Sequence, residues 1–299
     1  MVLEKNKKIK IGLVADDICS LPEKMVSQYQ IEIVRTKLSF PEWEKFPEKN
    51  MYQVMEETRA YPKTSAPSPG DYLKAYKKAL AVPGEPRPAG RENFDEVLVI
   101  TLSSKLSATY NSARQAKELM PDPSKITIFD SLQASVSEGL LVLKAAKLIN
   151  EGKNIEEILK FLEHFQKKVK LVGFLETTYW VEKIGRMSHW QATAFKFLKS
   201  FGIQPYIGIK KGKVGLIGFN FWTRDSFKAI FNQLKHEVKK TGKAQVGINY
   251  TDNIDTAHRL KEKVEKDLKN EVAFVSLVPS IVGANSGPGT LLAGTISYG

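Results

Sequence analysis

The chain has 299 residues, of which 42% are apolar and 26% are charged, a composition typical of a folded globular protein. At about 150 residues per domain, this length predicts two domains. A single cysteine, Cys19, excludes a disulfide framework and any metal site built from several cysteines. The formal charge of +12 is compatible with binding to nucleic acid, but the sequence has no nucleic-acid recognition motif. We therefore interpret the lysines as residues on solvated helix faces, which could attract acidic partners or anionic ligands.

The first half of the chain alternates predicted strands and helices. Strands are expected over 9–15, 31–40, 96–102 and 125–129. Helices are expected over 52–59, 68–80, 106–119 and 135–150. The Ser20-Leu21-Pro22-Glu23 and Asn154-Ile155-Glu156-Glu157 segments have the pattern of capping boxes, and residues 83–91 are rich in proline and glycine, as surface loops are. This alternation predicts an α/β fold whose first domain, residues 1–168, is a doubly wound parallel sheet.

The second domain, residues 169–299, is also expected to be α/β. A hairpin is predicted around Lys210-Lys211-Gly212-Lys213, between strands over 203–209 and 213–219. Residues 272–299 carry no charge, yet their prolines and glycines argue against a membrane-spanning helix and favour a strand, a glycine-rich loop and a final strand. The short apolar run at 11–15 ends at Asp16, before it could act as a signal peptide, so we expect a cytoplasmic protein.

Residues that commonly carry catalysis are sparse. His164, His236 and His258 fall on lysine- and glutamate-rich helices, and no histidine pair has the spacing of metal ligands, so we expect no metal site and no cofactor. Phosphate-binding glycine motifs are also absent. The strongest enzymatic signal is Asp16-Asp17 at the end of a strand. It leaves open an alternative function, a magnesium-dependent phosphotransferase or hydrolase.

Hydroxyl side chains gather where predicted strands meet helices. They occur in three segments, Thr64–Gly70, Ser103–Thr109 and Asp130–Ser137. In an open α/β sheet such junctions lie at the carboxyl edge, where ligands bind, and helix N-termini there favour a carboxylate or phosphate. Each serine alone could be an ordinary helix cap. Three such junctions together favour an anion-binding site without catalysis.

These segments resemble the DegV family. The similar motifs are Thr-Ser-x-Pro-Ser from Thr64, Ser-Ser-x-Leu-Ser-x-Thr-Tyr-x-Ser-Ala from Ser103, Asp130-Ser131, Gly139-Leu140, Gly185-Arg186-Met187-Ser188 and Gly287-Pro288-Gly289. They follow the family's order along nearly the whole chain. The resemblance implies two α/β domains with a long-chain fatty acid held between them. It also implies a binding protein that is not itself an enzyme, the fatty-acid-binding subunit of a bacterial fatty acid kinase.

The resemblance assigns roles to particular residues. It places Thr64, Ser65, Ser103, Ser104, Asn285 and Ser286 around the fatty-acid carboxylate. It ties Arg186 to phosphorylation of the fatty acid by a partner protein. In that role Arg186 would contact either the phosphorylated head group or the separate ATP-binding kinase subunit. Where the family usually has histidine this chain has Asn285, which can donate a hydrogen bond to a carboxylate but cannot carry charge.

Overall fold

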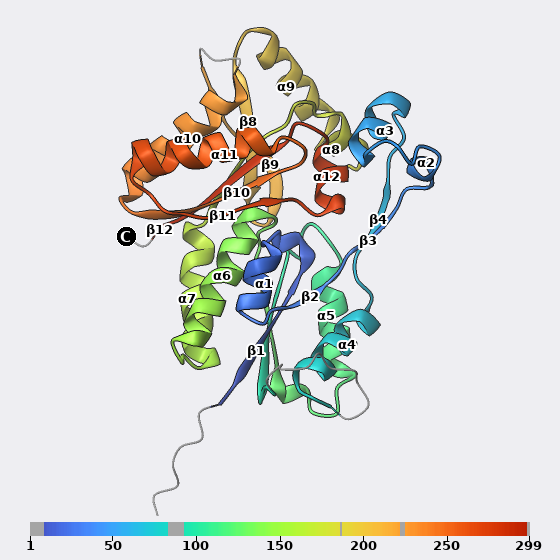
Figure 1. Cartoon of the computed structure of the whole chain (residues 1–299), viewed down its shortest axis with the longest axis vertical. Helices are drawn as coiled ribbons and strands as arrows, with labels where there is room; N and C mark the ends of the chain where they lie inside the picture. Colours follow the sequence, from blue (N-terminus) through green and yellow to red (C-terminus); the bar gives the residue numbers. More distant parts are fainter. Residues whose placement is uncertain (1–8, 83–92, 186, 222–224, 298–299) are drawn as a thin grey trace, which may run out of the picture.

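The described part of the chain forms two large β-sheets, with helices around and between them, and one small two-stranded sheet (Figure 1). A computed structural model describes residues 9–82, 93–185, 187–221 and 225–297. The predicted loop over 83–91 therefore lies outside the described residues. Within them, no helix is both long enough and apolar enough to cross a membrane.

The first sheet is parallel, with the strand order β2-β1-β5-β6. Its strands are β1 (Ile11–Asp16), β2 (Glu32–Val34), β5 (Glu96–Thr101) and β6 (Ile126–Asp130). The helices on it are α4 (Pro69–Ala79), α5 (Thr109–Glu118), α6 (Val136–Asn150) and α7 (Ile155–Lys168). Along β5, Val97 packs in the core under α4 and α5, whereas the next residue, Leu98, packs under α6 and α7. The predicted doubly wound parallel sheet is thus confirmed.

The second sheet is mostly antiparallel, with the order β11-β10-β12-β7-β8-β9. Its strands are β7 (Lys170–Phe174), β8 (Gln204–Lys210), β9 (Lys213–Asn220), β10 (Ala244–Tyr250), β11 (Val272–Leu277) and β12 (Leu291–Ser297). The predicted hairpin is confirmed, because Lys210 pairs with Lys213 across the turn that joins β8 to β9. Helices α10 (Ser226–Thr241) and α11 (Ile254–Lys263) cover one face of this sheet.

Helix α6 joins the two sheets into one core. Of its 15 residues, 11 are buried, and they surround the helix on every side except near its C-terminal end. Burial on all sides is expected of a helix that packs against both sheets. Leu140 and Leu141 belong to one buried cluster that also contains Leu98 of the first sheet and Leu292 of the second. The division of the chain near residue 168 stays a prediction, since the core is continuous across it.

An arm leaves the first sheet and reaches the second (Figure 1). It contains β3 (Lys37–Ser39), α2 (Pro41–Glu44), α3 (Met51–Thr58) and β4 (Lys63–Ser65). It packs against α8 (Tyr179–Lys183) and α12 (Ser280–Ser286), where Phe40 and Met55 share a buried cluster with Trp180 and Ala284. The arm thereby brings residues near 40–65 against the end of the chain.

The single strand expected over 31–40 is wrong. Its first part is β2, which pairs with β1, and its last part is β3, which pairs with β4 in a separate two-stranded sheet. The break falls at Thr36, whose N–H and hydroxyl both donate to the Asp17 carboxylate, at 3.0 and 3.1 Å. These hydrogen bonds turn the chain out of the first sheet.

Local capping signals succeed at one site and fail at another. Asn154 and Glu157 form the predicted capping box of α7. The box expected at Ser20 is wrong, since α1 (Glu23–Gln28) starts after Pro22 without a side-chain cap. Ser20 instead ends a 3-10 turn, Asp17–Cys19, with a φ of 52°, and its hydroxyl donates to the Ile18 carbonyl at 2.8 Å. The helix expected from 106 starts only at Thr109.

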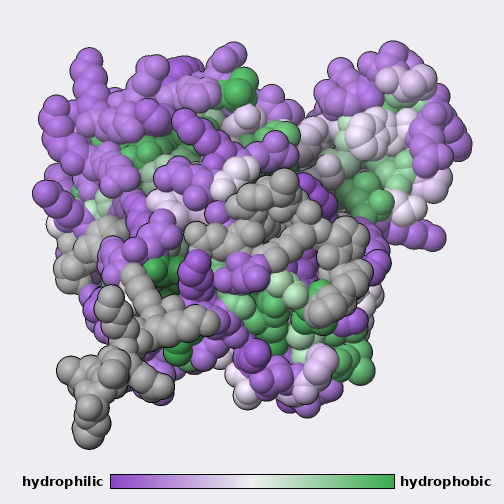
Figure 2. All heavy atoms as spheres, turned by 60° about the horizontal axis from the view of Figure 1, so that its bottom comes forward, coloured by the Kyte–Doolittle hydropathy of each residue, from purple (hydrophilic) through white to green (hydrophobic). Residues whose placement is uncertain are grey.

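Part of the C-terminal segment that the sequence predicts to be a loop is a helix. Between β11 and β12 the chain forms α12, and only 287–290 connect it to β12. The remaining elements are α9 (His189–Ser200), a 3-10 turn at Pro123–Lys125 and a π turn at Val264–Leu268. Lysines on α11 form i,i+4 ion pairs, Lys261 with Glu265 and Lys263 with Asp267. Figure 2 shows a mainly hydrophilic face, as expected for solvated lysine-rich helices.

Candidate functional site

A cavity lies between the two sheets. The second sheet contributes one wall, with Leu171 of β7, Ile207 of β8 and Leu292 of β12. The facing wall comes from the first sheet's carboxyl edge, with Ile18 after β1 and Leu102 after β5. Most of the lining is aliphatic. A cavity with these walls suits a long apolar ligand, which would be buried between the sheets.

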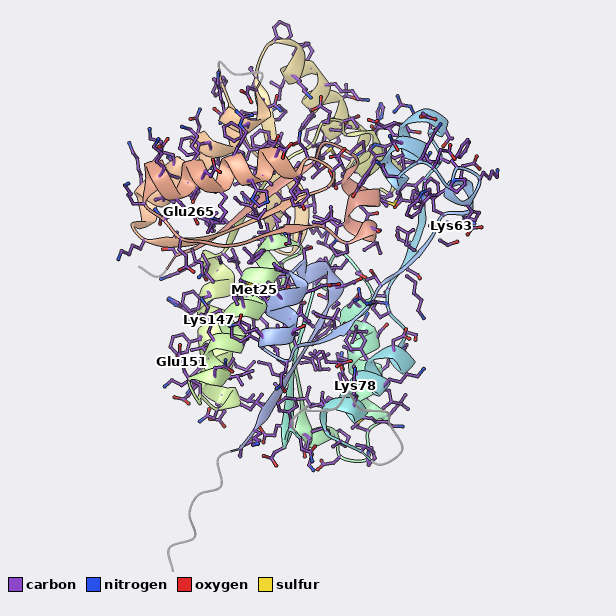
Figure 3. All side chains as sticks on the ribbon, viewed as in Figure 1. Met25, Lys63, Lys78, Lys147, Glu151 and Glu265 are labelled. Carbon is purple, nitrogen blue, oxygen red and sulfur yellow. The ribbon has the colours of Figure 1, made fainter. Side chains whose placement is uncertain are left out.

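Polar side chains enter the cavity mainly from β4 and from α12. These are Thr64 and Ser65 of the arm, and Asn285 and Ser286 at the end of the chain. Lys63, labelled in Figure 3, is exposed on β4, whereas the next residue, Thr64, lines the cavity. The Ser286 hydroxyl is buried and has no hydrogen-bond partner among the described residues. An unpartnered buried hydroxyl is costly unless a ligand or water satisfies it.

Asn285 is held by the arm. The Tyr61 hydroxyl donates a hydrogen bond of 2.6 Å to Asn285 Oδ1, across 224 positions of sequence. No local pattern in the sequence distinguishes Tyr61, so sequence reasoning missed it.

Ser103 and Ser104 do not line the cavity, although both were assigned to the carboxylate. The Ser103 hydroxyl donates to the Gly212 carbonyl at 2.7 Å and accepts from Lys105 N–H, which ties the β8–β9 turn to the loop after β5. Ser104 is exposed, and its N–H donates to Asp130. Two other hydroxyls of the same hydroxyl-rich junctions, Ser107 and Ser135, line the cavity instead. The assignment of Ser103 and Ser104 stays a prediction.

Arg186 lies outside the described residues. Its neighbours show how the segment is built: Gly185 has a φ of +69°, and Ser188 caps α9 through a capping box with Gln191. The contact between Arg186 and an anion or a partner stays a prediction.

The side chains of Asp16 and Asp17 both accept hydrogen bonds from backbone N–H groups. The Asp16 carboxylate is fully buried and accepts from Leu102 N–H at 2.8 Å and Ile18 N–H at 3.1 Å, so it caps a turn and joins β1 to β5. Asp17 holds Thr36. Among the described residues, no three histidine, cysteine or acidic side chains form a group that could hold a metal. No observation favours the alternative function at Asp16-Asp17.

The cysteine is buried, whereas the histidines lie at the surface. Cys19 is buried, and burial first, then the charge of Glu138, raise its thiol pKa well above the usual value, which disfavours the nucleophilic thiolate. The histidines are exposed, including His164 and His258. His189 has a carboxylate neighbour that the local sequence did not predict, because its Nδ1 contacts Glu182 of α8.

A second buried carboxyl group lies near Asp16. Glu138, in the first turn of α6, is fully buried and lies within hydrogen-bond reach of the Asp16 carboxyl group. Burial first, then the charge of Asp16, raises the pKa of Glu138 well above its usual value. Burial also raises the pKa of Asp16 to about 7, against the lowering effect of the Leu102 N–H. The folded chain therefore keeps protons that the unfolded chain releases near pH 4.

We expect the free energy of unfolding to fall as pH rises from about 4 toward and beyond 7, because the unfolded chain binds fewer protons over this window. Glu138→Gln removes one ionisable group without changing its shape, so it should raise stability by about 2 kcal/mol at pH 8 and by much less at pH 5. Urea unfolding at both pH values measures this difference. The exposed Glu118→Gln is the control, and an equal effect of both variants at pH 8 would contradict the prediction.

Known proteins resemble the chain over nearly its full length. The sequence model of the DegV family, described as an uncharacterised protein family, matches residues 10–296. A Thermotoga maritima protein named "Fatty acid-binding protein" is 27% identical over 294 residues, covering 95% of this chain and 96% of its own. A solved DegV family structure from Thermus thermophilus, described by its fatty acid binding, has a TM-score of 0.81 at 24% identity, covering 97% of this chain and 100% of that one. Another, from Thermotoga maritima and described as revealing a fatty acid binding function, has a TM-score of 0.77 at 25% identity, with the same coverage.

Proposed function

The chain belongs to the DegV family, and from this premise we propose that it binds a long-chain fatty acid in the cavity between its two sheets. The observation that carries the proposal is the cavity itself, which is aliphatic on the walls formed by both sheets and polar where β4 and α12 enter it. The relatives described above support it, since their names describe fatty acid binding and no reaction.

The aliphatic walls account for binding of the acyl chain. Leu171, Ile207 and Leu292 offer apolar surface from three strands of one sheet. Each methylene removed from water contributes about 0.8 kcal/mol, so a chain of about sixteen carbons gains enough to offset the loss of its freedom in solution.

The polar side chains account for binding of the carboxylate. Thr64, Ser65, Asn285 and Ser286 are neutral, and hydroxyl and amide groups can donate to a carboxylate without a buried counter-charge. A buried cation would add its own desolvation cost. The unpartnered Ser286 hydroxyl supports this placement of the head group, because a carboxylate oxygen would satisfy it.

Native mass spectrometry of the purified chain, followed by titration with hexadecanoic acid after delipidation, tests the proposal. We expect co-purified fatty acid, and saturable binding with one site per chain. Empty protein that also fails to bind added fatty acid would overturn it.

We further propose that the chain presents the carboxylate to a separate ATP-binding subunit. That subunit would transfer the γ-phosphoryl group of ATP to a carboxylate oxygen, which yields an acyl phosphate and ADP. The family resemblance ties Arg186 to this step. Its guanidinium can donate two parallel hydrogen bonds to a phosphate or to a carboxylate on an acidic surface.

Arg186→Ala should leave fatty-acid affinity within about twofold and lower phosphorylation by an added kinase subunit at least tenfold, the loss expected for a charge-assisted contact. Arg186→Lys should restore only part of the rate, since a point charge cannot reproduce the planar fork. Transfer of ³²P from ATP to the bound acid is the measurement. Equal losses of binding and phosphorylation would place Arg186 in the lipid site instead.

A further inference from the structure

We infer that Tyr61 is a positioning residue for the head-group site: it orients the Asn285 side chain so that the amide N–H groups face the ligand carboxylate. This inference rests on the proposed function and deepens it. It assigns a role to a residue that does not line the cavity, and it explains how an uncharged side chain can select an anion.

The contact between the two side chains determines the orientation. Tyr61 lies three residues before Thr64, and its hydroxyl donates to Asn285 Oδ1 at 2.6 Å. An amide oxygen accepts hydrogen bonds, whereas the amide nitrogen only donates them. With Oδ1 bound to the phenol, the Nδ2 group is the part of Asn285 that remains for a ligand in the cavity, which Asn285 lines.

This orientation matters because a free amide has two nearly isosteric orientations. In one, Nδ2 donates to the carboxylate. In the other, Oδ1 faces the carboxylate, and two acceptors repel each other. The phenol favours the first orientation before the ligand arrives, which lowers the cost of ordering the side chain on binding. The neighbouring Ser286 hydroxyl, buried and unpartnered among the described residues, supplies a second donor on the same helix.

The competing role for Tyr61 is to fasten the arm to α12. Other contacts also hold the arm. Lys183 Nζ donates to the Arg59 carbonyl at 2.9 Å, and the Tyr52 ring lies against Gly283 of α12. Loss of a fastening would weaken binding of every ligand alike, because the cavity wall would loosen. Loss of orientation would weaken only ligands that need a donor from Asn285.

Two ligands of equal chain length separate these roles: hexadecanoic acid and hexadecan-1-ol. We expect Tyr61→Phe to weaken binding of the acid about tenfold and of the alcohol by less than about twofold, since a hydroxyl can pair with either orientation of the amide. Tyr52→Phe is the matched control, a phenol on the same arm that contacts the same helix outside the cavity lining, and it should change neither affinity. Unfolding temperatures of all variants report on the arm.

A double-mutant cycle with Asn285→Ala completes the test. If Tyr61 acts through Asn285, Tyr61→Phe should have no further effect on acid binding in the Asn285→Ala background. A full effect that persists there, or equal losses for acid and alcohol, would overturn the inference and leave the proposed function intact. Failure of the unchanged chain to bind hexadecanoic acid would overturn the proposed function, and this inference with it.

Discussion

Ala134→Phe is expected to abolish most fatty-acid binding while the chain stays folded. Ala134 lines the cavity beside the start of α6, and it is only half-buried, so a larger side chain extends into the empty space. A phenyl ring would displace several methylenes of the ligand at about 0.8 kcal/mol each, which lowers affinity about a hundredfold. Titration with hexadecanoic acid measures the loss, and circular dichroism with thermal unfolding confirms the fold.

Ala108→Phe is the matched control for this variant. Ala108 precedes α5 in the neighbouring loop and is exposed, outside the cavity lining. The Ala108→Phe variant carries the same added ring without blocking the cavity, so its affinity for hexadecanoic acid should equal that of the unchanged chain. Undiminished binding by Ala134→Phe would mean that the acyl chain lies elsewhere.

Gly139→Ala is expected to destabilise the chain by about 3 kcal/mol, although alanine is the better helix former. Gly139 lies in the first turns of α6, packed against the turn that ends at Cys19. An added Cβ would clash with the Cys19 backbone carbonyl and would lie 3.1 Å from Phe274 Cζ. The Cys19 carbonyl belongs to the backbone and cannot rotate away as a side chain can. To make room for the Cβ, α6 would have to shift away from the first sheet or from β11. Urea unfolding measures the change.

Gly70→Ala provides the opposite expectation within a helix. Gly70 is in the first turn of α4, and an added Cβ there would meet only the Ser68 hydroxyl, at 3.7 Å. Alanine should therefore stabilise the chain by up to about 0.5 kcal/mol through helix propensity. Similar effects of Gly139→Ala and Gly70→Ala would show that the contact at Cys19 does not control packing of α6.

Part of the candidate site could be anticipated from sequence. The Thr64-Ser65 and Asn285-Ser286 pairs, both assigned through the family resemblance, do line one cavity. Ser103 was assigned by the same motif, yet its hydroxyl is engaged with the β8–β9 turn. Whether a hydroxyl faces a ligand or a neighbouring carbonyl depends on which distant segment packs there. Motif spacing does not contain that information.

The elements governed by near neighbours were determined by sequence alone. The Asn154 capping box, the turn at Lys211-Gly212 and the alternation behind the first sheet depend on residues within a few positions of one another. Patterns of this range also predicted the helix over 135–150, but not which two sheets it joins.

Only the tertiary structure decided how distant segments meet. In the folded chain the segment 31–40 is divided at Thr36, where the backbone N–H and the hydroxyl donate to Asp17 and not to a neighbouring strand. The C-terminal segment expected to be a loop forms α12. The tertiary structure also brought Tyr61 to Asn285 across 224 positions. Such contacts form because the arm and α12 bury Trp180 and Met55 together, and that burial has no local signature in the chain.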